Sequence, residues 1–301
     1  MNRPLKTHPA IRRSTSRRPT AAPLLLCACA VGIALLVGCA HLASSLPTGA
    51  PVPWAAEDGL PSRGSIVAGQ LVIHTDFPLA EQHRIIRELE SLRADVSQRL
   101  GLPISDEPVH LYLFETKERY DSFAARRFPA FPARRAFFVE TDTTLSVFAV
   151  WQDRIAEDLR HETTHGYVHA VVPAIPLWLD EGIAEFFELP SSQQGVHPAH
   201  TAHRAGRLLE GTWRPDLGRM EALASAGELS QDHYAEAWCW THWLLCTSKE
   251  RRRLLQDFLA DVRRDGQAAP LSARLKYAEG STTDLSAELR SHLESLVPAS
   301  R

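Results

Sequence analysis

The chain has 301 residues, 33 of them basic and 36 acidic, which gives a formal net charge of −3 at pH 7. This length allows one large domain or two small ones. Its basic residues do not form a cluster interleaved with aromatic residues, so the composition argues against nucleic acid as a partner.

The first 38 residues have the features of a secretory signal. They carry six basic side chains and no acidic one, and their second half is an apolar run. The run ends in Leu-Val-Gly-Cys at Cys39, which resembles a bacterial lipobox, in which the cysteine becomes the lipidated N-terminus. An uncleaved membrane anchor is the alternative, because about 18 apolar residues can just span a bilayer. We favour the lipoprotein because Cys39 stands where the apolar run stops.

This interpretation divides the chain into three parts. Residues 1–38 are the signal peptide, 39–64 are the lipidated cysteine and a flexible tether rich in Pro, Ser, Gly and Ala, and 65–301 are the folded domain. Without the signal peptide, 27 basic and 36 acidic side chains remain, a balance of −9. We expect the protein at the bacterial cell envelope, outside the cytoplasm and anchored to the membrane by its lipid. Because Ala40 and not Asp follows the cysteine, we expect the outer membrane, facing the periplasm, in a Gram-negative host.

The domain begins with alternating strands and helices and ends with helices. Apolar residues at helical spacing predict a helix over 79–100, and alternating side chains predict strands around it. The expected strands are 71–73, 109–114, 134–140 and 144–150, and the other expected helices are 117–127, one that begins near Asp153, one that begins near Leu177, 232–245 and 282–296. The pattern predicts an α+β fold, with a small mixed β-sheet before the helix near Asp153 and a largely helical C-terminal part.

The helix that begins near Asp153 contains His161-Glu162-Thr163-Thr164-His165, an HExxH motif. Residues four apart on a helix lie one turn apart on the same face, so both imidazoles can bind one metal ion. Zn²⁺ suits nitrogen ligands in a tetrahedral shell. The Glu of the motif can point at a metal-bound water and take its proton as general base. HExxH also occurs by chance, and on this motif alone a solvated helix without metal is an equally good interpretation.

A second helix follows closely and carries further carboxylates. Pro173 and Pro176 end the first helix and allow a new one to begin near Leu177. Glu181 on the new helix can supply a third ligand and leave the fourth position to water, as a catalytic zinc requires. Glu185 lies one turn further on and can accept the free ring N–H of a ligand histidine, which fixes the tautomer of that ring.

The pair HETTH and WLDEGIAEFFE resembles the motifs of the gluzincin zinc metallopeptidases, of the peptidase MA-like group with an EGxAE third-ligand helix. The resemblance covers 28 residues and implies a gluzincin-like fold, a Zn²⁺ cofactor and a peptide or protein substrate. In that family the two histidines and the Glu of EGxA bind zinc, which correspond here to His161, His165 and Glu181. The resemblance also implies that Glu162 is the general base and that Glu185 supports a ligand histidine.

Two further features of that family concern the substrate. Its aminopeptidases carry an upstream Gly-x-Met-Glu-Asn element whose Glu holds the free amine; here Glu140 is the only carboxylate in a comparable place, and its neighbours do not match. This departure favours an endopeptidase or an unusual substrate. The family also binds extended substrates by strand addition on an edge strand just upstream of HExxH. The candidate here is 144–150, although its lack of a clear polar face fits an ordinary core strand equally well.

Residues downstream of the third ligand offer a donor for the oxyanion that forms during peptide hydrolysis. Gluzincins place a Tyr or His on a later helix for this purpose, and we assign the role first to Tyr234 and second to His233. A packing role for Tyr234 is the alternative. His197, His200 and His203 recur at every third residue, and we interpret them as the exposed start of a helix, with a second metal patch as the alternative.

The sequence therefore predicts a lipid-anchored zinc metallopeptidase. Three alternatives stay open: a metal-binding envelope scaffold without peptidase activity, an amidase that acts on cell wall or another non-protein substrate, and a structural lipoprotein whose HExxH match is accidental. Metal content separates the first two from the third. Hydrolysis that is lost in Glu162→Gln separates an enzyme from a scaffold.

Overall fold

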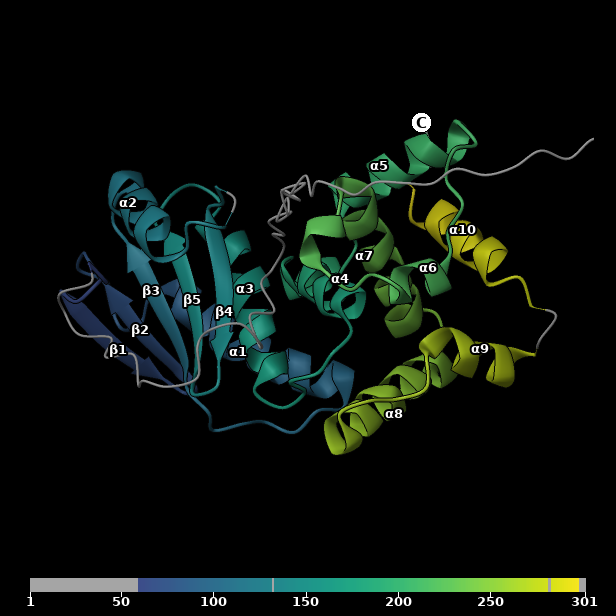
Figure 1. Cartoon of the computed structure of the whole chain (residues 1–301), viewed down its shortest axis with the longest axis horizontal. Helices are drawn as coiled ribbons and strands as arrows, with labels where there is room; N and C mark the ends of the chain where they lie inside the picture. Colours follow the sequence, from purple (N-terminus) through teal and green to yellow (C-terminus); the bar gives the residue numbers. More distant parts are fainter. Residues whose placement is uncertain (1–58, 132, 281–282, 298–301) are drawn as a thin grey trace, which may run out of the picture. The chain divides into compact units, whose positions relative to one another are not determined.

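Five strands form one mixed sheet in the part of the chain that the computed structural model describes, residues 59–301 without 132, 281–282 and 298–301 (Figure 1). These residues all belong to one compact unit, Leu35–Arg301. The strands are β1 (Gly64–Ala68), β2 (Leu71–Thr75), β3 (Val109–Phe114), β4 (Ala136–Thr141) and β5 (Thr144–Val150). The helices are α1 (Arg84–Leu100), α2 (Lys117–Arg127), α3 (Ile155–His169), α4 (Leu177–Phe187), α5 (Pro198–Leu209), α6 (Leu217–Glu221), α7 (Gln231–Cys246), α8 (Lys249–Asp265), α9 (Leu271–Glu279) and α10 (Leu285–Leu296).

The sheet has the strand order β1-β2-β3-β5-β4. Strands β2, β3 and β5 are parallel, and the two outer strands pair antiparallel to their neighbours. The expectation that 144–150 forms the edge strand is therefore wrong. This segment, β5, pairs with β3 on one side, and the short turn after Thr141 folds β4 back against its other side. Strand β4 is consequently the edge next to the zinc-motif helix α3, with which it is in contact.

Both faces of β5 are buried, which explains why 144–150 has no polar face. Leu145, Val147 and Ala149 of β5 point into the larger core, which α1 and α3 cover. Phe148 and Val150 alternate with them and point into a second, aromatic core under α2. Strands buried on both faces show continuous apolar runs, so the sequence carries no sign of which strand lies at the edge.

The remainder of the described chain is helical, with α4 and α7 at its centre (Figure 1). Every residue of α4 is buried, and α7 buries Trp238, Trp240 and Trp243. These large side chains make the aromatic run of α7 a packing surface. The predicted α+β organisation, a small sheet followed by mostly helical structure, is confirmed.

Other expectations fall partly or wholly outside the described residues. The expected signal peptide, Cys39 and most of the tether lie there, and they stay predictions. Ordered structure begins slightly before residue 65, the predicted start of the domain. Strand β1 begins at Gly64, and Leu60 is already buried in the aromatic core. Within the described segments, no helix is both long enough and apolar enough to cross a membrane.

Two glycines allow the motif helices to lie close to their neighbours. A Cβ on Gly166 of α3 would come 2.7 Å from Cγ1 of Val109 in the sheet. A Cβ on Gly182 of α4 would come 2.3 Å from Oγ1 of Thr241 and 2.6 Å from the carbonyl oxygen of Ala237 in α7. Each glycine follows a candidate metal ligand by one position, so helix packing and ligand position depend on the same close contact.

We expect Gly182→Ala to lower the free energy of unfolding by about 3 kcal/mol, because the added methyl group overlaps backbone and forces α4 away from α7. The helix propensity of alanine would by itself stabilise the helix by about 1 kcal/mol. Gly206→Ala on α5 is the control, since its Cβ would meet no atom within 4 Å and should stabilise slightly. Denaturant unfolding of both variants measures the difference, and equal midpoints would contradict this account of the α4–α7 contact.

Candidate metal centre

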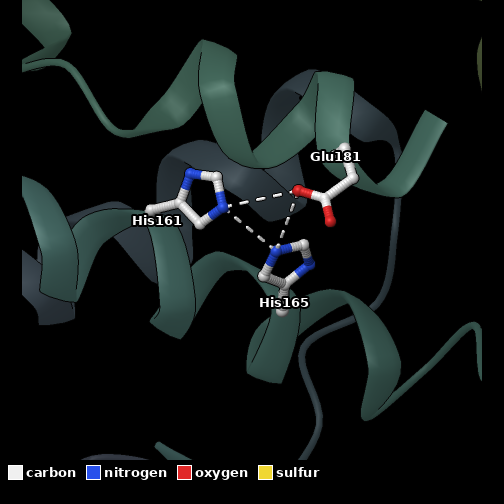
Figure 2. A group of neighbouring side chains, drawn as sticks. All are labelled: His161, His165 and Glu181. Carbon is white, nitrogen blue, oxygen red and sulfur yellow. Dashed lines mark hydrogen bonds and ion pairs between the residues drawn. The ribbon is translucent and has the colours of Figure 1, made fainter. Parts of the chain in front are cut away.

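Helices α3 and α4 bring His161, His165 and Glu181 together. The two Nε2 atoms are 3.3 Å apart. Oε2 of Glu181 lies 3.6 Å from Nε2 of His161 and 3.8 Å from Nε2 of His165. Figure 2 shows the three side chains pointing at one another across the gap between the helices. Ligand atoms of a tetrahedral zinc site are about 3.3 Å apart when the bonds are about 2.0 Å long. These separations therefore fit one zinc-sized cation.

The chemistry of these donors also fits a metal. Glu181 has no exposed surface, and neither of its carboxylate oxygens has a hydrogen-bond partner among the described residues. Burial raises the pKa of Glu181, but His161 and His165 outweigh burial and lower it, which favours the anion. A buried carboxylate without hydrogen bonds is destabilising unless a cation is bound beside it. Two imidazoles and one carboxylate are a common zinc set with one position left open.

Other carboxylates hold the Nδ1 atoms of the two histidines. Oδ1 of Asp180 lies 2.9 Å from Nδ1 of His165. Oε2 of Glu188, the residue that ends α4, lies 3.0 Å from Nδ1 of His161. A carboxylate on Nδ1 keeps the ring proton there and leaves Nε2 as a lone-pair donor toward the metal position. We expected Glu185 to support a ligand histidine; the structure places Glu188 there, and Glu185 is hydrogen-bonded to His200 at 2.7 Å.

Helical geometry explains why Glu188, and not Glu185, contacts His161. At about 100° per residue, Glu185 is displaced by about 40° around the helix axis from Glu181, whereas Glu188 is displaced by only about 20°. Glu188 therefore projects more nearly in the direction of the third ligand, two turns further along. Arg160 donates a hydrogen bond to the backbone carbonyl of Glu188, which ties this helix end to the HExxH helix.

The support of His165 continues through His169 to the edge strand. Oδ2 of Asp180 lies 3.1 Å from Nε2 of His169, and Nδ1 of that ring lies 2.7 Å from Glu140 on β4. Burial lowers the pKa of His169, but the two carboxylates outweigh it and raise the pKa to about 9. His169 therefore joins Asp180 to β4.

Glu162 faces a cavity of about 440 Å³. The cavity is lined by His161, by Ala133–Ala136 at the start of β4 and by Tyr234 of α7, among others. Glu162 is only 5% exposed, and its Oε2 has no hydrogen-bond partner among the described residues. Burial raises its pKa, although His161 and His165 act against burial. A carboxylate in this state is suited to accept a proton near neutral pH.

Two arginines give the cavity wall positive charge beside its carboxylates. Arg135 is bound by Asp158, with Nη2 2.6 Å from Oδ1. Arg134 donates to the hydroxyl oxygen of Tyr234 at 3.3 Å. Tyr234 thus lies on the wall of the same cavity as Glu162, as its assignment requires. His233 does not share this position: its Nδ1 accepts a hydrogen bond from the backbone of Ser230 at the start of α7.

The three spaced histidines of α5 differ from the expectation. His197 and His200 are buried, and His203 is bound to Asp232 at 2.8 Å. The interpretation as an exposed helix start is wrong for the first two. Glu185 and Glu188 provide the physical reason, because their buried carboxylates need hydrogen-bond donors and α5 supplies them.

Comparisons with known proteins give one family match and one similar solved structure. Residues 155–266, from α3 to the end of α8, match a family described as "Protein of unknown function (DUF1570)". No curated protein matches the chain. Among solved structures, the chain is similar to the M1 zinc metallopeptidase from Deinococcus radiodurans, at 19% identity and a TM-score of 0.41. That alignment covers 79% of this chain and 51% of the other, so this chain spans about half the length of that enzyme. The family match contains His161, His165 and Glu181 but none of the sheet.

Proposed function

We propose that this protein is a zinc-dependent hydrolase of peptide bonds, a gluzincin-type metallopeptidase. One observation carries the proposal: two Nε2 atoms and one buried carboxylate oxygen lie 3.3, 3.6 and 3.8 Å apart with no hydrogen bond to Glu181 among the described residues. The motif pair HETTH and WLDEGIAE supports the same assignment. His161, His165 and Glu181 hold the zinc in this proposal.

Zinc held by such a set supplies a Lewis acid that activates water and polarises a carbonyl group. Glu162, next to the ligand His161 and on the cavity wall, takes the proton of the attacking water and passes it to the leaving nitrogen. Asp180 and Glu188 keep the ring protons of the ligands on Nδ1. The chain itself therefore supplies the base, the ligand orientation and a cavity for the scissile bond.

The edge strand β4 is the proposed binding surface for an extended substrate. Among the described residues β4 pairs with β5 and has no strand on its other side. The residues that lead into it line the cavity beside Glu162. An extended peptide can add to such an edge through main-chain hydrogen bonds, which make few demands on its sequence. Glu140, the candidate for binding a free amine, is bound to His169 and does not line the cavity, so we propose an endopeptidase.

Tyr234→Phe should lower kcat for peptide hydrolysis by about 100-fold or more, with zinc content unchanged. The phenol donates to the developing oxyanion, and loss of one such donor raises the barrier by about 2.7–4 kcal/mol. The hydrogen bond from Arg134 to the phenol oxygen strengthens this donor. Steady-state kinetics on a fluorogenic peptide measure the change. His233→Ala is the neighbouring control, and a loss of kcat in that variant alone would move the assignment to His233.

Metal removal tests the proposed function directly. The purified full chain should contain about one zinc and should cleave an unfolded protein such as reduced casein. A chelator should abolish cleavage, and added zinc should restore it. A folded chain that holds zinc but cleaves neither casein nor a peptide library would instead be the metal-binding scaffold or the amidase with a non-protein substrate. A folded chain that takes up no zinc would leave only the structural lipoprotein.

A further inference from the structure

Next to the candidate metal centre, four buried side chains of α4, its C-terminal end and the start of α5 pair with one another, and two of them, Glu185 and Glu188, also line the cavity beside Glu162. Glu188 joins His161 to His197: its Oε2 lies 3.0 Å from Nδ1 of the ligand, and its Oε1 lies 2.5 Å from Nε2 of His197. Glu185 pairs with His200 at 2.7 Å, and the rings of His197 and His200 stack with centroids 4.0 Å apart. This group is a second place where imidazoles and carboxylates converge.

Distances distinguish this group from the metal centre. In the metal centre three donor atoms, 3.3 to 3.8 Å apart, converge on one point, as ligands around an ion do. In the second group the carboxylates lie 2.5 and 2.7 Å from the imidazoles, which is hydrogen-bond contact. The contacts of the second group are therefore those of a hydrogen-bonded support for the metal centre.

The direction of these hydrogen bonds follows from the start of α5. His197 is the N-cap residue of this helix, and its Nδ1 accepts the backbone N–H of His200 at 3.3 Å. In a neutral imidazole one nitrogen accepts and the other carries the proton. The proton of His197 is therefore on Nε2 and is donated to Glu188. Glu188 then accepts a second hydrogen bond, from the N–H at Nδ1 of His161, and Nε2 of His161 keeps its lone pair toward the metal position.

The choice of residue at this cap supports the same conclusion. Ser, Thr, Asp and Asn are the usual N-cap residues, because their short side chains reach the first free backbone N–H groups. Histidine can accept the same kind of backbone N–H through one ring nitrogen, and its second ring nitrogen reaches Glu188 outside the helix. Pro198 at the first helical position fixes the backbone just after the cap. A histidine here makes one ring both the helix cap and the donor to Glu188.

We propose that His197 is a positioning residue for the zinc site, through which the N-terminus of α5 fixes the tautomer of the ligand His161. The chain of contacts runs from the backbone N–H of His200 through His197 and Glu188 to His161. This inference rests on the proposed function for its consequence, since the fixed tautomer matters because His161 binds zinc. It does not require His197 to touch the metal or the substrate.

His197→Asn in the full chain is the decisive variant. Asparagine retains the helix cap but is too short to replace the donor to Glu188, so the fold should stay intact. Zinc affinity, measured by competition with a chelator, should fall by about 10-fold, the low end of the roughly 10- to 100-fold loss for a direct hydrogen-bond partner of a ligand, because Glu188 itself remains in place. His203→Asn on the same helix is the matched control, and its affinity should equal that of the unmodified chain.

Imidazole tautomers provide a readout that does not depend on zinc. Long-range ¹H–¹⁵N spectra of the metal-free, histidine-labelled chain at pH 8 should show His161 protonated on Nδ1 and His197 on Nε2. In His197→Asn the signal of His161 should shift toward a mixture of both tautomers. Assignment comes from the loss of each signal in His161→Gln and His197→Asn. If the chain took up no zinc, the proposed function would fail while these spectra would still decide the positioning.

Two results would overturn the proposal. One is a His197→Asn chain whose zinc affinity and His161 tautomer both match those of the unmodified chain. The other is a stoichiometry of two zinc ions per chain that falls to one in His197→Asn and stays at one in His165→Ala. That second result would make the group of Glu185, Glu188, His197 and His200 a metal site in its own right.

Discussion

Glu162→Gln should keep its zinc and lose peptide hydrolysis, with kcat/KM lower by about 1,000-fold. The substitution replaces a base with an amide of the same shape, and general-base catalysis contributes about 100- to 10,000-fold. Glu162 is not one of the three proposed ligands, and its side chain faces the cavity, so the zinc site should remain intact. Zinc content and kinetics on the same preparation separate the loss of the base from the loss of the metal.

Glu157→Gln is the control for this result. Glu157 lies on α3 and lines the same cavity, but it pairs with Arg154 and is more exposed than Glu162. Its substitution should change kcat/KM by less than about 3-fold, as is usual for exposed ion pairs. A Glu162→Gln chain with activity within 10-fold of the unmodified protein would remove Glu162 from the role of base.

Glu181→Gln should largely abolish zinc binding. The amide removes the anion that faces the two Nε2 atoms, and no other carboxylate is grouped with both histidines at this distance among the described residues. We expect the affinity to fall by more than the roughly 100-fold that follows the loss of an outer partner. Titration against a chelator gives the affinity. Thermal unfolding gives a second measurement, because a ligand that binds the folded chain raises its melting temperature.

Glu140→Gln provides the matched comparison for that experiment. Its carboxylate is also partly buried and bound to an imidazole, but it reaches the site only through His169 and Asp180. Zinc should therefore raise the melting temperature of Glu140→Gln and of the unmodified chain, and should leave Glu181→Gln unchanged. A zinc-dependent rise in Glu181→Gln equal to that of the other two would show that the third ligand is elsewhere.

The site itself could be predicted from local spacing. His161 and His165 share one face because they are four apart on a helix, and two prolines allow Glu181 to fold back toward them. Each of these relations acts within one helix or across one short turn. The structure accordingly brings these three residues together as the sequence predicts. Four of the strands and several helices were predictable for the same reason, although α1 begins at Arg84 because His83 caps it. Strand β1 and the helices α6, α8 and α9 were not among the expected elements.

The features that could not be predicted depend on contacts between distant segments. Strand β4 lies at the edge because β5 pairs with β3 on its other side. Since β4 and β5 are both largely apolar, their composition does not show which of them is the edge strand. The burial of His197 depends on its contact with Glu188 at the end of α4. The spacing of seven residues places Glu188 on nearly the same side of the helix as Glu181, but it does not identify His197 as the partner. Asp180 could have been found from its position next to Glu181, because it lies at the start of the helix that faces His165.

From the arrangement of α3 and α4 we also expect an order of events during folding. All three proposed ligands, together with Asp180 and Glu188, lie within residues 161–188, on two consecutive helices. Closing so short a loop is entropically cheap compared with assembling the parallel strands of the sheet. Yet every residue of α4 is buried in the finished fold, so this helix pair exposes an apolar surface until α7 docks. Zinc captured at that stage would be held without the support of α5, and its affinity would increase when His197 reaches Glu188. Metal retention would thus report the completion of folding, and not only the presence of the motif.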